Sequence, residues 1–312
     1  MIRLSIWLAL ILTFVTTCLS RETLQIPDTG WRLLPDTAAA WQNDRIYLPE
    51  EVDLQKLPVN PPTGGWAVLN NAAGIEVKLP ATVEQYFWRK FGWRRYHDEY
   101  YFENEDAQVK NGGYRGVSWW WREIEVPKSF RGKKVILHIR GARLRAEVYL
   151  NRRLVGYNII NETGFTCVVS EALRAGERNL LAIRITNPGG RFDWLDTKLM
   201  SWGERRFHAS HGFGGLDRGL FFTAHDSCFI EDCWVLNTPQ IRKIKGCVKI
   251  QNSSRRLLQG ELRFEVRNPN HKNQVCSTTR RSVQIKPLGK IQIEEEIDYP
   301  EAKLWDLQHP EL

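Results

Sequence analysis

What this sequence has little of already excludes several classes of protein. Its six cysteines show none of the paired close spacings that bind zinc. No stretch beyond the first twenty residues is apolar enough to cross a membrane. The net charge of +8 comes from scattered basic pairs with acidic neighbours, whereas nucleic-acid binding favours one clustered patch. We therefore expect no metal site, no cofactor, no membrane span and no nucleic-acid partner.

The first twenty residues have the features of an export signal. Arg3 precedes an apolar run over residues 6–15, which is too short to span a bilayer, and cleavage is expected near Ser20. A lipid anchor at Cys18 is the alternative, although the residues before it fit that signal poorly. We expect residues 1–20 to be a signal peptide and the mature chain to be secreted or periplasmic, in an oxidising compartment.

Five cysteines remain after the expected cleavage, so at least one is unpaired within the chain. Disulfides between Cys228 and Cys233 and between Cys247 and Cys276 are possible. The alternative is that these cysteines are free thiols that pack as small apolar side chains.

From about residue 116 onward, apolar residues alternate with polar ones, which predicts β-strands. Residues 144–150 are an example: Leu, Ala, Val and Leu share one face, and Arg145, Glu147 and Tyr149 alternate with them, as in a half-buried antiparallel strand. Helical periodicity is almost absent. Short strands separated by glycine, proline and asparagine predict an all-β sandwich or jelly roll. Residues 21–115, rich in proline and aromatics, are expected to add edge strands and long loops.

The pattern changes near Thr238 and Pro239. Beyond this point aromatic residues become sparse and the alternation is cleaner, which predicts a smaller immunoglobulin-like sandwich. Such a domain needs about 100 residues, and only about 70 follow the change. We therefore expect a first domain over residues 21–238 and a second, truncated domain over residues 239–312.

The stretches 114–127, 146–156, 175–187, 214–220 and 304–312 follow one another along the chain, and in this order they resemble the glycoside hydrolase family 2 enzymes. The stretch 114–127 is similar to the entry strand of the family's sugar-binding domain, and 146–156 to its hairpin. The stretch 175–187 resembles a later strand, 214–220 the closing signature, and 304–312 a run late in the immunoglobulin-like domain. In the hairpin, Arg152 and Arg153 stand where the family often has glycine, so we expect a longer turn.

The resemblance implies a galactose-binding-like jelly roll followed by an incomplete immunoglobulin-like sandwich. It also implies a retaining glycosidase mechanism, with two glutamates on a (β/α)₈ barrel that follows the second sandwich. This chain has no strand–helix alternation for such a barrel. We therefore predict the non-catalytic front part of a secreted glycosidase, with a glycoside ligand and the missing barrel as its partners, and no hydrolysis by this chain alone. The alternative is a stand-alone carbohydrate-binding or structural module.

No catalytic residue is predicted, but five side chains are candidates for contacting a sugar. Trp119 and Trp121 share one face of a predicted strand, and indole rings stack well on sugars. In many family members a carboxylate six positions before the glycine of the closing signature contacts the sugar, whereas this chain has Ala209 there. His208 and His211 flank that position and are candidate donors. Asp217, which lies within the closing signature, is either a sugar contact or a structural partner of Arg218.

Overall fold

The computed structural model describes residues 21–40, 52–70, 72–87, 116–159, 163–187, 214–268 and 274–300, the single residues 47, 90, 114 and 308, and the backbone of 93–98 and 101–106. This part of the chain is almost entirely strand. Its helical elements are α2 (Val83–Phe87) and two 3-10 turns, η2 (Trp66–Val68) and η3 (Lys128–Phe130). None of the helices in the described ranges is long and apolar enough to cross a membrane.

The chain divides into two compact units, which are described separately. The first unit is Glu22–Ala224, and the second contains the described residues from His225 onward together with Arg21. The sequence analysis placed the change near residue 238. In the structure, β16 (Cys228–Asn237) pairs along its length with β17 (Lys243–Asn252), so this strand belongs to the second unit.

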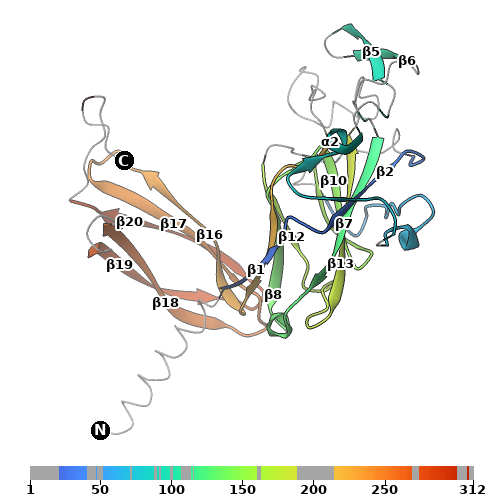
Figure 1. The fold of residues 1–312 in the computed structure, drawn as a ribbon. Helices are drawn as coiled ribbons and strands as arrows, with labels where there is room; N and C mark the ends of the chain where they lie inside the picture. The colour runs from blue at the N-terminus through green and yellow to red at the C-terminus, as the bar shows by residue number, and fades with distance from the viewer. Residues whose placement is uncertain are drawn as a thin grey trace. The chain divides into compact units, whose positions relative to one another are not determined.

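The first unit is a sandwich of two sheets (Figure 1). One sheet has the order β1-β15-β8-β12, and its strands are β1 (Arg21–Ile26), β15 (Leu220–His225), β8 (Lys134–Ile139) and β12 (Phe165–Val168). The other has the order β11-β10-β13-β7-β2-β3, formed by β11 (Arg153–Asn158), β10 (Arg145–Leu150), β13 (Arg178–Asn187), β7 (Gly116–Glu125), β2 (Trp31–Asp36) and β3 (Ile75–Val77).

The apolar side chains of both sheets meet in one core. Leu137 of β8 and Phe222 of β15 belong to the same buried cluster as Trp120 of β7 and Ile183 of β13, and each of these side chains is fully buried. Because alternate residues of a strand point to opposite faces, one set per strand suffices to fill this core. The expected all-β, jelly-roll architecture is confirmed.

The hairpin between β10 and β11 differs from its expectation. Leu150 pairs with Arg153, so the turn contains only Asn151 and Arg152. Both residues have positive φ angles, 51° and 71°, as a type I′ two-residue turn requires. Arginine therefore replaces glycine without lengthening the turn. The Asn151 side chain supports it by donating to the Ala172 carbonyl (2.8 Å).

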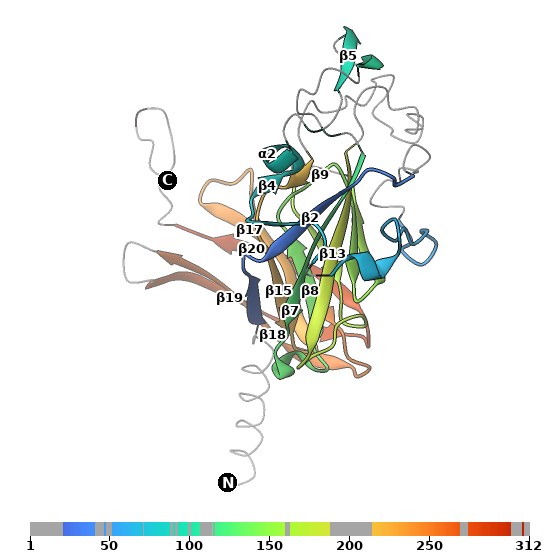
Figure 2. The same cartoon turned by 45° about the vertical axis from the view of Figure 1, so that its right-hand side comes forward.

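A small sheet lies at one end of the first unit, beside α2 (Figure 2). Its order is β4-β14-β9, formed by β4 (Ala81–Thr82), β14 (Gly215–Leu216) and β9 (Ala142–Arg143). β14 belongs to the closing motif that the sequence analysis identified. A separate backbone hairpin pairs β5 (Trp93–Asp98) with β6 (Tyr101–Asp106).

The second unit contains a three-stranded sheet, β16-β17-β20, and the hairpin β18-β19. Its remaining strands are β18 (Leu258–Asn268), β19 (Gln274–Ile285) and β20 (Lys290–Asp298). The buried cluster of this unit is formed by Val248, Ile250, Ile285 and Ile293. Within the described ranges none of the five cysteines forms a disulfide, so neither Cys228 with Cys233 nor Cys247 with Cys276 is bonded. Cys228 and Cys233 lie on the same extended strand, whose rise of about 3.3 Å per residue keeps them too far apart to pair.

Candidate functional site

The two tryptophans predicted to stack on a sugar are buried. Trp119 is 0% exposed and Trp121 is 1% exposed, and both belong to a second apolar cluster on the outer face of the six-stranded sheet. Trp66 packs edge-on against Trp119, with ring centroids 5.7 Å apart. Neither ring presents a face to solvent, because residues of the segment 52–70 cover that side of the sheet. These side chains form a core in this structure and not an open platform.

The segment 52–70, here called the strap, is tied to the sheet by polar side chains. The Asn60 backbone N–H donates to the Tyr149 hydroxyl (3.1 Å), and its side-chain amide donates to Glu147 Oε1 (2.8 Å). The Thr63 N–H donates to Asp36 Oδ2, which also accepts from Trp119 Nε1 (2.9 and 3.2 Å). Asp36 and Glu147 are thus hydrogen-bonded where the strap crosses the strands.

Beneath the strap lies a buried ionic network that sequence reasoning missed. Arg145 Nη2 lies 2.7 Å from Glu147 Oε1, and Arg184 Nη1 lies 3.2 Å from Glu147 Oε2. All three side chains are at most 3% exposed. Burial, followed by the charge of Glu147, raises the pKa of Tyr149 above its usual value, so this phenol stays a hydrogen-bond donor to Glu147. The alternation along β10 correctly assigned the two faces, but both faces are buried.

Asp217 is the predicted site residue that remains accessible. It follows β14, its side chain is 45% exposed, and Arg218 Nε lies 3.8 Å from its Oδ2. The carboxylate rests directly on Gly141: a Cβ there would lie 1.7 Å from Asp217 Oδ1. The absence of a side chain at residue 141 therefore lets Asp217 lie at the end of the small sheet. His208 and His211 lie outside the described residues.

Four buried residues, Glu84, Tyr114, Asn187 and Gly214, pack together near α2. Glu84 Oε1 of α2 accepts from the Tyr114 backbone N–H (3.1 Å), and Asn187 Nδ2 donates to the Tyr114 carbonyl (3.1 Å). A Cβ at Gly214 would lie 2.8 Å from the Cβ of Asn187. Burial, followed by the charges of Asp36 and Glu84, raises the pKa of Tyr114, whose hydroxyl donates to the Val117 carbonyl (2.6 Å).

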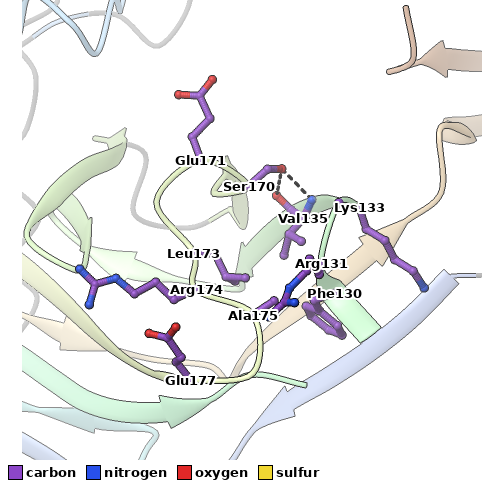
Figure 3. A pocket seen from close by; sticks show the side chains of 11 residues that line it. Phe130, Arg131, Lys133, Val135, Ser170, Glu171, Leu173, Arg174, Ala175 and Glu177 are labelled. Carbon is purple, nitrogen blue, oxygen red and sulfur yellow. Dashed lines mark hydrogen bonds between the residues drawn. The ribbon is translucent and has the colours of Figure 1, made fainter. Parts of the chain in front are cut away.

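A separate hollow of about 500 Å³ is lined by the loops that follow β7 and β12 (Figure 3). Its lining includes Lys133, Glu171 and Arg174, whose side chains point in different directions in Figure 3. Lys133 is also held by Glu22 (3.4 Å). Because these charged groups do not converge, the hollow offers no arrangement for recognising a particular ligand.

The buried carboxylates of the described residues are Asp36, Glu84 and Glu147, and each accepts hydrogen bonds from its surroundings. Two of them lie under or beside the strap, and Glu84 lies at the base of α2. Their partners are backbone N–H groups, an amide, an indole, a phenol and two arginines, which is the environment of structural carboxylates. Within the described ranges, no three His, Cys, Asp or Glu side chains gather as metal ligands would.

These observations define a class: an all-β chain with a jelly-roll unit and a second, smaller sandwich, whose buried polar groups serve the fold. No family model matches the sequence. Among curated proteins, it is 28% identical over 128 residues to a β-glucuronidase of Formosa agariphila, covering 41% of this chain and 12% of the relative. It is 26% identical over 222 residues to a β-galactosidase of Thermoanaerobacter pseudethanolicus, covering 68% of this chain and 26% of that enzyme.

Solved structures agree with the sequence relatives. The β-glucuronidase of Bacteroides uniformis matches 93% of this chain and 29% of its own, with a TM-score of 0.63 and 17% identity, which shows the fold alone. Further structural neighbours are glycoside hydrolase family 2 enzymes. The chain is therefore related to the family 2 β-glucuronidases and β-galactosidases, as its motifs predicted. It spans about a quarter or less of the length of the two curated relatives.

Proposed function

We propose that this chain is the amino-terminal, non-catalytic part of a secreted glycoside hydrolase family 2 enzyme, and that it supports a catalytic barrel supplied by further polypeptide. The observation that carries the proposal is the two-unit all-β architecture, which matches 93% of this chain but only 29% of a β-glucuronidase. Hydrolysis by a retaining glycosidase needs two carboxyl groups about 5–5.5 Å apart beside the scissile bond. The buried carboxylates described above are instead engaged by structural donors.

In this proposal the substrate class is a β-glycoside, and Asp217 is the side chain of the first unit that contacts it. Its carboxylate is exposed at the end of the small sheet and is suited to accept hydrogen bonds from sugar hydroxyls. The burial of Trp119 and Trp121 favours this scaffold role over a stand-alone carbohydrate-binding module, which needs an accessible aromatic platform.

The non-catalytic role is tested by assaying the purified chain with 4-nitrophenyl β-D-glucuronide and β-D-galactoside. No release of nitrophenol above the buffer blank is expected, with the Thermoanaerobacter β-galactosidase as the positive control. Turnover by the purified chain would contradict the role. Calorimetric titration with glucuronate and galactose should also show no heat, whereas binding would favour the stand-alone module.

The scaffold role is tested on the source DNA beyond codon 312, which is expected to encode a (β/α)₈ barrel. Hydrolysis should then appear when the chain and barrel are expressed as one polypeptide. In that enzyme, Asp217→Asn should lower kcat/KM by about tenfold or more, as loss of a charged hydrogen bond of ~1.5 kcal/mol does. Glu171→Gln, at a carboxylate 81% exposed on another loop, is the matched control and should have no effect. A reading frame without a barrel would refute the scaffold role.

Secretion is tested separately by fusing residues 1–20 to a phosphatase that is active only after export. We expect activity outside the cytoplasm, and we expect Cys18→Ser to leave it unchanged. Retention of the reporter in the cytoplasm would contradict export, and loss of membrane attachment in the Cys18→Ser variant would instead support the lipid anchor.

A further inference from the structure

The end of the first unit at which β13 begins is remote from the small sheet. β13 runs from Arg178 at this end to Asn187 at the other, and its ten residues span about 30 Å. Asn187 packs against Gly214, which directly precedes β14, so Asp217 belongs to the other end. Any ligand held where β13 begins therefore binds far from the proposed sugar contact.

Two asparagines fix the loops that surround the start of β13. Asn151, in the β10–β11 turn, donates from its amide to Asn179 Oδ1 (2.8 Å). Asn179 is fully buried, and it clamps the loop 170–178 at Arg174 by accepting from the backbone N–H and donating to the carbonyl (both 2.8 Å). One hydrogen-bond network therefore positions the backbone of Arg174 and of Arg152, the second residue of the turn.

Arg152 occupies a position of the turn that favours glycine. Its φ angle is 71°, and a side chain in this left-handed region raises the conformational energy of the folded state. The side chain is nevertheless exposed, and no ion pair joins its guanidinium to a described residue. Because neither burial nor a salt bridge offsets the strain, the charge of this side chain is the property that a ligand can use.

Three more exposed cations at this end form no ion pair with a described residue: Lys128, Arg131 and Arg174. Arg131 and Arg174 line the hollow of Figure 3 from two different loops. Lys128 packs against the loop that carries Arg174, since a Cβ at Gly176 would lie 2.7 Å from Lys128 Cγ. These three residues and Arg152 form what we call the basic end.

The charges of this surface are spread out and do not converge on one point. In Figure 3, Arg174 and Lys133 point to opposite sides of the hollow. Arg153 is paired with Glu171 (2.7 Å), whereas Glu177 is exposed and has no ion pair among the described residues. A small ligand needs converging polar groups. A polymer that carries one anion on each repeating unit can instead contact charges that lie apart.

We propose that the basic end, together with Glu177, binds an anionic polysaccharide whose repeating units are uronic acids. Each unpaired arginine can pair with a carboxylate of the polymer through two parallel N–H donors, and Glu177 can accept hydrogen bonds from its hydroxyl groups. The site holds a polymer chain away from the bond that is cut. The choice of a polysaccharide rests on the proposed glycosidase role, whereas the placement of the cations does not.

A nucleic acid fits this surface less well. The DNA backbone offers phosphates without hydroxyl donors, so Glu125, Glu171 and Glu177 would only repel it. Single strands also need aromatic rings on which bases stack, and Phe130, which lines the hollow, is 1% exposed. A uronic acid polymer presents carboxylates to the cations and hydroxyl groups to the glutamates, so it offers partners for both signs of charge.

The test is affinity electrophoresis of the purified full chain in native gels that contain sodium polygalacturonate, with uncharged pullulan as the control polymer. Polygalacturonate should retard the chain and pullulan should not. Raising the NaCl concentration from about 20 to about 200 mM should weaken the affinity at least about tenfold, because each contacting cation displaces counterions from the polymer. Monomeric galacturonate should not compete, since a single exposed ion pair contributes little.

A combined variant, Arg131→Gln with Arg152→Gly and Arg174→Gln, should weaken binding about tenfold, as the loss of three exposed charged contacts does. Glycine suits the φ angle of residue 152, so the turn is not strained by this change. The matched control removes the same charge from exposed positions of the second unit: Arg255→Gln, Arg256→Gln and Lys286→Gln. This control should change the affinity by less than about twofold, and unchanged thermal midpoints verify that both variants are folded.

The variant Glu177→Ala separates recognition of a polysaccharide from attraction by charge alone. If the surface attracts polyanions only through its charge, removing this carboxylate strengthens binding. The proposal predicts binding weaker by about threefold, because an acceptor for the hydroxyl groups of the polymer is lost. Duplex DNA at the same concentration of anionic groups should compete less effectively than free polygalacturonate.

The proposal is overturned if polygalacturonate does not retard the chain, if the two combined variants lose affinity equally, or if Glu177→Ala binds more tightly. Equal or stronger competition by duplex DNA would also overturn it, since the surface would then not select a polysaccharide. Such a failure leaves the scaffold role intact, because binding is measured without the barrel. A reading frame without a barrel refutes the scaffold role and leaves the measured binding unchanged.

Discussion

The two units of this chain bury their strands to different extents. In the first unit, the six-stranded sheet is covered on both faces: Trp120 enters the central core, while Trp119 and Trp121 lie beneath the strap. In the second unit, the buried cluster has four residues, and Val235 on the inner face of β16 is 63% exposed. The same alternating pattern therefore leads to a sheet covered on both faces in one unit and, among the described strands of the other, to a sheet with one exposed edge strand.

The two units also differ in whether their ion pairs are buried or exposed. The first unit buries Glu147 between two arginines, and both carboxylate oxygens are engaged: Oε1 by Arg145 and the Asn60 amide, and Oε2 by Arg184. In the second unit, the ion pairs lie at the surface, for example Lys245 with Glu294, 35% and 47% exposed. Removing one partner of a buried ion pair leaves the other charge buried without a counter-charge, which costs stability. At the surface, water solvates the remaining charge, so the loss is small.

The largest expected effect follows from that contrast in charge burial. Glu147→Gln should lower the free energy of unfolding of the first unit by ~3–5 kcal/mol, because Arg145 and Arg184 stay buried without a counter-charge. In the second unit, Glu295→Gln removes the partner of the half-exposed Arg281 and should cost at most ~1 kcal/mol. Urea unfolding measures the free energy of unfolding of both variants. Equal losses of stability would contradict the distinction between buried ion pairs in the first unit and surface ion pairs in the second.

The next effect compares one substitution in the two cores. Ile183→Ala in the first unit should cost ~4–5 kcal/mol, because the closed core around a fully buried side chain cannot collapse into the cavity. Ile293→Ala in the second unit should cost ~2–3 kcal/mol, since an open core relaxes more readily. Hydrogen exchange, which reports each unit separately, is the measurement. A larger loss for Ile293→Ala would mean that the second unit is the better packed one.

A smaller effect concerns glycines on which other groups pack. A Cβ at Gly215 would lie 2.2 Å from the Ala81 carbonyl oxygen, so Gly215→Ala must push β14 away from β4 and should cost ~2–3 kcal/mol. A Cβ at Gly246 would lie 3.0 Å from the ring of Phe264, which is partly buried and has room to shift. Gly246→Ala should therefore cost ~1 kcal/mol, and thermal midpoints of the two variants test that order.

The smallest effect is a pH dependence at the surface of the second unit. The hydrogen bond from Arg267, followed by the nearby arginine charges, lowers the pKa of Glu265 from 4.5. A lowered pKa stabilises the fold above the unfolded value of 4.5, and that contribution is lost as the pH falls below it. Glu265→Gln should lower the thermal midpoint slightly at pH 7 and not at about pH 3. A difference that persists in acid would assign the effect to packing.

Much of the fold follows from local patterns in the sequence. The alternation of residues 144–150 predicted β10 and the assignment of its side chains to two faces, and the breakers at 187–190 predicted where β13 ends. The ordered motifs predicted the family to which the relatives and structural neighbours belong. These features need only neighbours along the chain, so sequence reasoning reaches them.

The candidate site was predicted less well, because burial on the second face of a strand depends on segments far away in the sequence. Nothing near Trp119 shows that residues 52–70 will cover it, and nothing near Glu147 shows that Asn60 will reach it. The available signal was the spacing of Arg145 and Glu147, which lie two residues apart and therefore on one face of the strand. On an exposed strand such an ion pair adds little stability, so its presence was a hint of burial. Asp217 is the predicted contact whose exposure leaves a sugar role open to test.

The sequence by itself therefore determined the all-β class, the positions of several strands and the relationship to family 2 glycosidases, because alternation and turn residues act within a few positions. Only the tertiary structure decided which strand faces are covered. A strand face is covered only where a segment distant in the sequence packs on it. The strap packs on β7 and β10, and no described strand packs on β16.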